Sequence, residues 1–338
     1  MPNTASLTIC DVTLRDGSHA YNHKITADQI YAYAKASEES GFDYLEVGHG
    51  NGLGASSLQV GESLLSDYEM LRYAKNVLKN TKLSVHVIPG FATLQKDIEP
   101  AIKLGVDLFR IGCHCTEADI SQKHISFIRS AGKEAWGVLM MSHMASAEVL
   151  LEECKKMQSY GAQGVVLMDS AGAYTPSETS KKISVLVENL EIPVGFHAHN
   201  NLGLSIANSL SAIETGARIL DGTAKGFGAG AGNAPIEIIA ALVKKLNYPT
   251  NINLYKALDA AELAANLFSG SLPKSDSITI VSGISGVFSG FSKPVVRIAE
   301  KYKIDPRDIL TELGLKNAVG GQEDLIVEVA SVLALKSK

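Results

Sequence analysis

The sequence predicts an α/β fold, a TIM (β/α)8 barrel followed by a C-terminal helical domain. Short apolar, β-branched runs alternate with longer amphipathic stretches from residue 7 to about residue 247, and eight such pairs can be counted. This is the pattern of parallel strands covered by crossover helices. After about residue 250 only helical patterns remain. We therefore expect a barrel domain over residues 1–250 and a helical domain over residues 251–338.

Eight β/α pairs favour a closed barrel over an open doubly wound sheet, and no GxGxxG fingerprint follows the first apolar run. The predicted strands are Leu7–Leu14, Tyr44–Val47, Leu83–Ile88, Leu108–Ile111, Ala135–Met141, Gly164–Met168, Pro193–His197 and Arg218–Asp221. The helix candidates between and after them include Ala27–Ser40, Tyr68–Leu78, Ala118–Ser130, Ala147–Tyr160, Pro176–Glu188, Leu204–Thr215 and Pro235–Lys245.

Glycines punctuate the end of several predicted helices, where the chain needs a residue that tolerates positive φ. They are Gly41, Gly105, Gly132, Gly161 and Gly216. In the C-terminal domain we expect the helices Leu254–Phe268, Pro294–Tyr302, Pro306–Leu313 and Glu323–Leu335, joined by a Gly/Ser-rich segment, Ser269–Ser292.

Composition narrows the class of protein. The chain has 338 residues, 46% of them hydrophobic and 20% charged, and a net charge of -5 without a Lys/Arg block. These values fit a compact soluble enzyme and give no footprint for nucleic acid. Four cysteines without paired spacings indicate reduced thiols, and we find no secretory leader and no apolar membrane span. We expect a cytoplasmic protein.

Two motifs at predicted strand ends carry the chemistry. The segment 11–19 (DVTLRDGSH) ends the first strand, and residues 197–199 (HAH) end the seventh. Because the side-chain period of a strand is two, His197 and His199 face the same side, and Asp16 can add a carboxylate. Two half-buried histidines would explain HAH equally well if it stood alone. Together with Asp16, the set favours a divalent cation such as Mn²⁺, Mg²⁺, Co²⁺ or Zn²⁺.

TLRDG at the first strand and HxH at the seventh resemble the DRE-TIM metallolyase superfamily, which includes isopropylmalate and homocitrate synthases, hydroxymethylglutaryl-CoA lyase and 4-hydroxy-2-oxovalerate aldolase. Longer words select the branch. Along nearly the whole chain, the sequence resembles the 4-hydroxy-2-oxovalerate aldolase family in CDVTLRDGSHA (10–20), HCTEADIS (114–121), LMMSHM (139–144), GAGAGNAP (228–235) and VGGQEDLI (319–326).

The resemblance implies a class II pyruvate aldolase that cleaves a 4-hydroxy-2-oxo acid to pyruvate and an aldehyde through a metal-stabilised enolate. The ion would be held by Asp16, His197 and His199, and Mn²⁺ is the expected ion, with Mg²⁺ or Co²⁺ as alternatives. Arg15 would stabilise the enolate oxygen, or else close the barrel with a salt bridge. His19 would take the proton from the C4 hydroxyl, or else be a loop histidine bonded to backbone.

Three further positions follow from the resemblance. Ser170 matches the residue that hydrogen-bonds the substrate carboxylate, while its neighbour Asp169 could instead orient a histidine ligand. Asn233 would be a further metal ligand or, equally, the N-cap of the next helix. The cluster of Cys113, His114 and Cys115 has the wrong spacing for a zinc finger, and we interpret it, like His143, as structural.

The chain departs from the family pattern at two positions that bear on the aldehyde pocket. Phe288 stands where the family has a tyrosine, so the ring is kept and the hydroxyl is lost. His86, in residues 85–90 (VHVIPG), is polar where the family's third strand runs through leucines that line the pocket. If His86 points inward, the aldehyde portion would carry a polar group; if it points outward, it packs under a helix.

Family members commonly pair with an acylating acetaldehyde dehydrogenase, so a hetero-oligomer with such a partner is an expectation here. Two alternatives remain at this point. One is a Claisen-type, acyl-CoA-dependent synthase of the same superfamily, which usually has Gln where this chain has Ser18-His19. The other is a non-catalytic scaffold for a dehydrogenase, although a scaffold would need none of the residues Arg15, Asp16, His19, His197 and His199.

Overall fold

The computed structural model describes residues 6–269 and 272–336. Eight parallel strands form a closed barrel in chain order, and β1 pairs with β8 to complete it. The predicted fold class is confirmed. The strands are β1 (Thr8–Leu14), β2 (Tyr44–Val47), β3 (Lys82–Val87), β4 (Leu108–His114), β5 (Glu134–Met140), β6 (Val165–Asp169), β7 (Val194–Ala198) and β8 (Ile219–Gly222).

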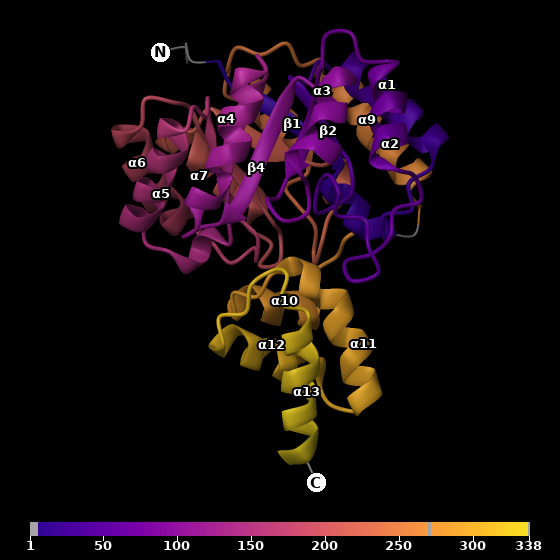
Figure 1. Ribbon diagram of the computed structural model, residues 1–338, viewed down its shortest axis with the longest axis vertical. Coiled ribbons are helices and arrows are strands. Elements are labelled where there is room, and N and C mark those ends of the chain that lie inside the picture. The colour runs from indigo at the N-terminus through magenta and orange to yellow at the C-terminus, as the bar shows by residue number, and fades with distance from the viewer. Residues whose placement is uncertain (1–5, 270–271, 337–338) are drawn as a thin grey trace.

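Helices cover the outside of the barrel and form a second group beyond one of its ends (Figure 1). Around the barrel lie α1 (Ala27–Ser40), α2 (Asp67–Lys75), α3 (Glu99–Lys103), α4 (Gln122–Ser130), α5 (Ala147–Ser159), α6 (Pro176–Asn189), α7 (Ser205–Thr215), α8 (Ile236–Lys245) and α9 (Leu254–Leu267). The second group contains α10 (Ser277–Ile284), α11 (Ser292–Tyr302), α12 (Pro306–Leu315) and α13 (Asp324–Lys336).

Local sequence explains several helix ends. Thr26 and Thr175 begin α1 and α6 with reciprocal capping boxes to Gln29 and Glu178, which satisfy backbone N–H groups in the first turn. All five glycines predicted to end helices have positive φ, as expected for residues without a Cβ. No bounds were predicted for the short α3, which follows a π-turn at Leu94–Ile98, although Gly105 was expected to end a helix there.

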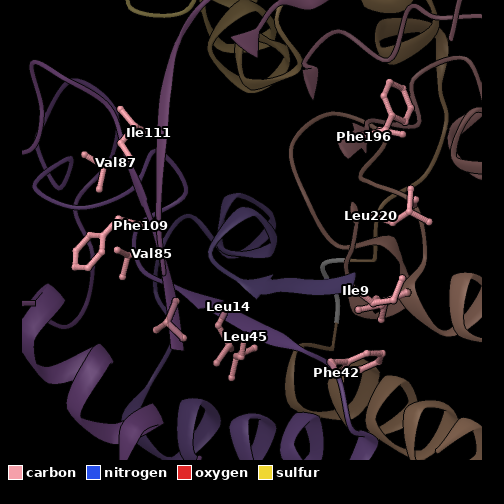
Figure 2. Packing of buried hydrophobic residues seen from close by; sticks show 14 of the residues in the cluster. Ile9, Leu14, Phe42, Leu45, Val85, Val87, Phe109, Ile111, Phe196 and Leu220 are labelled. Atoms are coloured by element: carbon pink, nitrogen blue, oxygen red, sulfur yellow. The ribbon is translucent and has the colours of Figure 1, made fainter. Parts of the chain in front are cut away.

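The outward-facing and inward-facing residues of the strands pack in different environments. Outward-facing residues pack under the helices in the main hydrophobic core, and Figure 2 shows part of it, including Val85, Val87, Phe109 and Ile111. Inward-facing residues near the strand beginnings form a smaller apolar plug that contains Tyr44, Leu108 and Ile219. Two residues further along each of these three strands, the interior becomes charged. The residues there are Glu46, Arg110 and Asp221.

Helix α9 packs against α1 and α8, and its residues Ala257, Ala261 and Ala264 belong to the core around the barrel. This packing attaches α9 to the barrel unit, whereas the expected division at residue 250 placed it in the C-terminal domain. The reason is that α9 has a small-residue face that fits closely against α1, a tertiary property that periodicity alone does not reveal.

The remaining helices form the C-terminal unit, residues 272–336, which has its own core of Val287, Phe291, Leu310, Leu313 and Ile326. The prediction that residues 269–292 only join helices was wrong, because α10 lies within them; residues 270 and 271 fall outside the described part. Asp276 caps α10 by accepting hydrogen bonds from the backbone N–H groups of Ile278 and Thr279. The helix was not predicted because its sequence, SITIVSGI, is rich in β-branched residues, which have a low helix propensity.

Candidate metal centre and active site

Three potential metal ligands meet at the C-terminal mouth of the barrel. Asp16 begins the 3-10 turn Asp16–Tyr21 after β1, His197 lies in β7, and His199 follows that strand. Asp16 Oδ2 lies 3.4 Å from His197 Nε2 and 3.9 Å from His199 Nε2. Ligand atoms of the three residues all lie within 4.8 Å of one another. The structure thus brings together the three residues that the sequence selected.

Several atoms of this cluster are free to bind a ligand, because they do not hydrogen-bond to one another. Asp16 Oδ1, His197 Nε2 and His199 Nδ1 are buried and have no hydrogen-bond partner in the part of the chain that the structure describes. Burial lowers the pKa of His199 to about 3, because the loss of water outweighs the attraction of Asp16. A neutral imidazole has a lone pair to give to a metal.

Behind the ligands runs a chain of fully buried ion pairs. The guanidinium of Arg15 donates from Nε to Glu46 Oε1 at 2.5 Å and from Nη1 to Asp16 Oδ2 at 2.6 Å. Arg110, from β4, donates to Glu46 Oε2 at 3.1 Å and to Asp221 Oδ2 at 2.5 Å. The two arginines and three carboxylates therefore alternate across the barrel interior.

Asp221 ends this chain at a ligand. His197 Nδ1 lies 2.9 Å from Asp221 Oδ2, so the ring donates its hydrogen there and turns Nε2 toward Asp16. Although burial alone would lower the pKa of His197, the nearby carboxylates of Asp16 and Asp221 raise it. A proton and a metal ion compete for the same Nε2 lone pair, so this raised pKa marks a place that favours a cation.

The charges also suit a divalent ion. Arg15 and Arg110 oppose Asp16, Glu46 and Asp221, which leaves one net negative charge in a buried site when the histidines are neutral. A divalent cation would reverse this to one net positive charge, which a monoanionic substrate would neutralise. Charges in a low-dielectric interior favour such neutralisation strongly.

Asn233 lies beside this cluster. A Cβ built on Gly228 would lie 2.6 Å from Asn233 Nδ2 and 3.2 Å from Asp16 Oδ1, so glycine is required where the loop passes between them. Asn233 Nδ2 donates to Phe227 O at 3.2 Å, while its Oδ1 is buried and unbonded. The alternative role as an N-cap is wrong, because Pro235 occupies the N-cap position of α8.

His19 lies in the turn that begins with Asp16 and is partly buried. Its ring packs edge-on against His23, with centroids 4.9 Å apart, and His23 in turn stacks on His49. Burial lowers the pKa of His19, and the positive charges of Arg15 and Lys293 act in the same direction against the attraction of Asp16. The imidazole is therefore a neutral group that can accept a proton.

An elongated cavity of about 370 Å³ opens beside the site. Ser170 and Phe288 line it together with Met140 and Met141. Ser170 is buried, and its Oγ accepts a hydrogen bond from Met141 N, which leaves the hydroxyl hydrogen available to a ligand. Met141 holds a left-handed backbone with φ of 54°, the kind of local strain that is common at functional sites.

His86, which was also predicted to bind the substrate, lies outside this cavity. His86 points into the barrel, because Val85 and Val87 on either side of it face the outer core. Among residues 6–269 and 272–336, however, it does not line the cavity beside Ser170. Burial and then the charge of Arg15 lower the pKa of His86 to about 3. The outward orientation considered from the sequence is therefore wrong.

Asp169 contacts His199 through its backbone carbonyl, which accepts a hydrogen bond from His199 N at 3.4 Å, and not through its carboxylate. Its carboxylate instead accepts the backbone N–H groups of Ala173 and Tyr174 at 2.9 and 3.1 Å and so shapes the turn after β6. Cys113 and Cys115 lie in the outer core, and His114 bonds Thr116. His143 contacts Gly286 O through Nε2 at 2.9 Å, which ties the loop after β5 to the C-terminal unit.

Comparison with known proteins decides the family. Residues 6–264 match the HMGL-like family, and residues 273–335 match the DmpG-like communication domain. A Pectobacterium atrosepticum protein named 4-hydroxy-2-oxovalerate aldolase is 54% identical over 332 residues, which cover 98% of this chain and 97% of that protein. The chain belongs to the 4-hydroxy-2-oxovalerate aldolase family. It is therefore an enzyme, a carbon–carbon lyase of the aldolase class.

Further relatives agree with this family. A protein of the same name from Spirochaeta aurantia is 54% identical and covers 99% of this chain and 98% of its own. Among solved structures, the N-terminal domain of a putative aldolase from Bacteroides vulgatus has a TM-score of 0.74 at 26% identity and covers 86% of this chain and 96% of its own. The resemblance stated from the sequence is confirmed.

The fold reaches beyond the family. The carboxyl transferase domain of Rhizobium etli pyruvate carboxylase, solved with pyruvate and biocytin, has a TM-score of 0.83 at 14% identity and covers 99% of this chain and 61% of its own. At this identity the likeness extends only to the fold. No helix among the described residues is long and apolar enough to cross a membrane.

Sequence reasoning missed the buried partners of this aldolase site, namely Glu46, Arg110 and Asp221. A signal was present, because each is a charged residue within or at the end of an otherwise apolar strand pattern. Charged residues are almost never fully buried unless they are paired. Three such residues on barrel strands should therefore have indicated a shared ion-pair network.

We expect Asp221→Asn to weaken binding of Mn²⁺ about 10- to 100-fold, because His197 loses the charge that orients its ring. Isothermal titration of metal-stripped protein would measure the change. Asn keeps the size of the side chain and a hydrogen-bond acceptor, and circular dichroism would confirm folding. Asp119→Asn, which removes a carboxylate away from the site, is the matched control. Unchanged affinity in Asp221→Asn would contradict the role assigned to this contact.

Proposed function

We propose that this aldolase cleaves a 4-hydroxy-2-oxo acid, 4-hydroxy-2-oxovalerate or a close relative, to pyruvate and an aldehyde. The observation that supports the proposal is the buried set of Asp16, His197 and His199, with Arg15 directly beside it. This set belongs to an ion-pair network with one net negative charge. A 2-oxo acid offers a carboxylate and a keto oxygen to such a site. The names of the relatives point to the same substrate class.

A divalent ion held by these three residues, with Mn²⁺ as the proposed ion and Mg²⁺ or Co²⁺ as alternatives, would supply a Lewis acid for the 2-oxo group. The chain itself supplies a second positive charge. Arg15 Nη2 is buried and has no hydrogen-bond partner among the described residues, while Nε and Nη1 are fixed by Glu46 and Asp16. This free donor is placed to stabilise negative charge on the substrate oxygen when the C3–C4 bond breaks.

His19 provides the base. Cleavage requires removal of the proton from the C4 hydroxyl, and a partly buried imidazole with a lowered pKa is neutral at physiological pH. Ser170, with its free hydroxyl hydrogen, would bind the carboxylate. The aldehyde portion would then extend into the cavity of about 370 Å³, whose walls include Ile88, Met140 and Phe288.

The position of His86 changes the interpretation of this pocket. Its ring faces the charged interior, where burial and then the charges of Arg15 and Glu46 act most strongly on its pKa, and the mostly apolar cavity is lined by other residues. We therefore propose that His86 lies below the oxo-acid end of the substrate. An apolar aldehyde fits the cavity better than a polar one.

A panel of aldehydes incubated with pyruvate and Mn²⁺ tests the reaction in the reverse direction. We expect 4-hydroxy-2-oxo acid adducts, best with short alkyl aldehydes, and loss of this activity after exhaustive chelation followed by recovery with added metal. Mass spectrometry of the products measures both. Full activity in the chelated protein, or release of free CoA from acetyl-CoA and a 2-oxo acid without aldol formation, would overturn the proposal.

Replacing His19 by alanine should lower kcat for pyruvate formation by about 100- to 10,000-fold, the range contributed by general bases. Metal content should stay the same, because His19 is not part of the ligand set. Coupled reduction of the pyruvate by lactate dehydrogenase gives the rate, and elemental analysis gives the metal. Undiminished turnover would remove His19 from the mechanism.

Phe288→Tyr restores the hydroxyl that the family pattern leads one to expect. Since one hydrogen bond contributes roughly 1 kcal/mol, the change should alter aldehyde preference or stereoselectivity about 2- to 10-fold. Chiral chromatography of adducts from several aldehydes measures the ratio, with Phe288→Leu as a control for ring volume. Identical ratios in wild type and Phe288→Tyr would show that the aldehyde end is recognised by shape alone.

We further propose that the C-terminal unit binds an acylating acetaldehyde dehydrogenase. This unit matches a communication domain, and it exposes large apolar side chains that the barrel leaves uncovered. Ile284, Leu315 and Leu335 are 73%, 74% and 71% exposed, respectively. A bound partner would cover large apolar side chains of this kind.

A further inference from the structure

The C-terminal unit is bonded directly to the loops that build the site. Ser289 N donates to Ser170 O at 2.9 Å, and Asn201 Nδ2 donates to Ser289 Oγ at 3.0 Å. A third connection comes from the first turn of α11, where Lys293 reaches the turn that carries His19. Each of these loops follows a barrel strand, so the C-terminal unit lies over the mouth of the barrel (Figure 1).

Lys293 places its ammonium at the end of the 3-10 turn Asp16–Tyr21. Its Nζ donates to His19 O at 2.9 Å, to Ala20 O at 3.3 Å and to Asn22 Oδ1 at 2.8 Å. An ammonium has three hydrogens to donate, so its donors are all used on this one turn. Carbonyl groups at the end of a helical turn carry partial negative charge, which a cation stabilises.

The turn needs such support. Asn22 and His23 are consecutive non-glycine residues with positive φ, 51° and 62°, a conformation that costs free energy at each residue. Two of the bonds of Lys293 fall just before these two residues, on the carbonyls of His19 and Ala20, and the third holds the side chain of Asn22. A change in the orientation of the His19 carbonyl would rotate the backbone that carries the imidazole.

We propose that Lys293 is a positioning residue that fixes the His19 imidazole and thereby couples the C-terminal unit to proton transfer. The inference rests on the proposed role of His19 as the base. Lys293 would have no contact with the substrate and would act only through the turn. Because it belongs to α11, a shift of this helix would act first on the end of the turn that carries His19, three residues beyond Asp16.

Lys293→Met tests this, since it removes the charge and keeps an unbranched apolar stem at an exposed position. We expect kcat to fall about tenfold, as small misplacements of catalytic groups do, with KM within about twofold and metal content and melting temperature unchanged. Lys293→Arg should recover most of the rate. Lys301→Met, at the far end of the same helix, is the matched control and should behave as wild type.

A double-mutant cycle separates this inference from the proposed function. In the His19→Ala background, Lys293→Met should have little further effect on the residual rate, because the group through which it acts is gone. An equal loss in both backgrounds, or an unchanged kcat in the single Lys293→Met variant, would overturn the inference. Full activity of His19→Ala would instead overturn the proposed base.

Discussion

The structure of the site depends on Arg110, a fully buried guanidinium in the centre of the barrel that holds Glu46 on one side and Asp221 on the other. A buried charge is tolerated only when its partners are in place, and removal of one partner of such a pair typically costs about 3–5 kcal/mol. Glu46 fixes Arg15, and Asp221 fixes His197. One residue thus sets the orientation of Arg15 and of His197, the proposed catalytic arginine and one of the proposed metal ligands.

The same network explains why a cation belongs here. Ionised groups inside a protein are stable when charge is close to balanced, and the alternating chain from Asp16 to Asp221 leaves one negative charge over. Both ends of the chain are carboxylates, and unbonded atoms of Asp16, His197 and His199 gather at the Asp16 end. An ion at this point would be the last member of a charge pattern that the barrel strands have already built, which favours a preformed rather than an induced site.

Hydrophobic periodicity and the positions of glycines were enough to predict the fold. They are local features of the sequence, and they gave the eight strands, the helix ends and the strand-end position of Asp16, His197 and His199. The features that were not predicted depend on contacts between residues that are far apart in the sequence. Arg110 and Asp221 are 111 residues apart in the chain, and only barrel closure brings them together. Helix α10 was missed because its β-branched residues oppose helix formation locally and its cap and packing override them. The attachment of α9 to α1 is likewise decided by tertiary contact.

Polarity changes in steps along the barrel axis, and each step depends on the one before it. The apolar plug of Tyr44, Leu108 and Ile219 excludes water from below, which strengthens every interaction of the ion pairs above it. These pairs fix the ligands and Arg15 at the mouth. Beyond them, the apolar cavity and the C-terminal unit cover the site from the other side. The interior of the site is therefore completed only where the two units meet, and Ser170, Asn201 and His19 all lie on loops that the C-terminal unit bonds. A barrel without that unit would keep Asp16 and His197, which Arg110 and its partners hold from below, but it would leave the loops that carry His19 and Ser170 without their outer support.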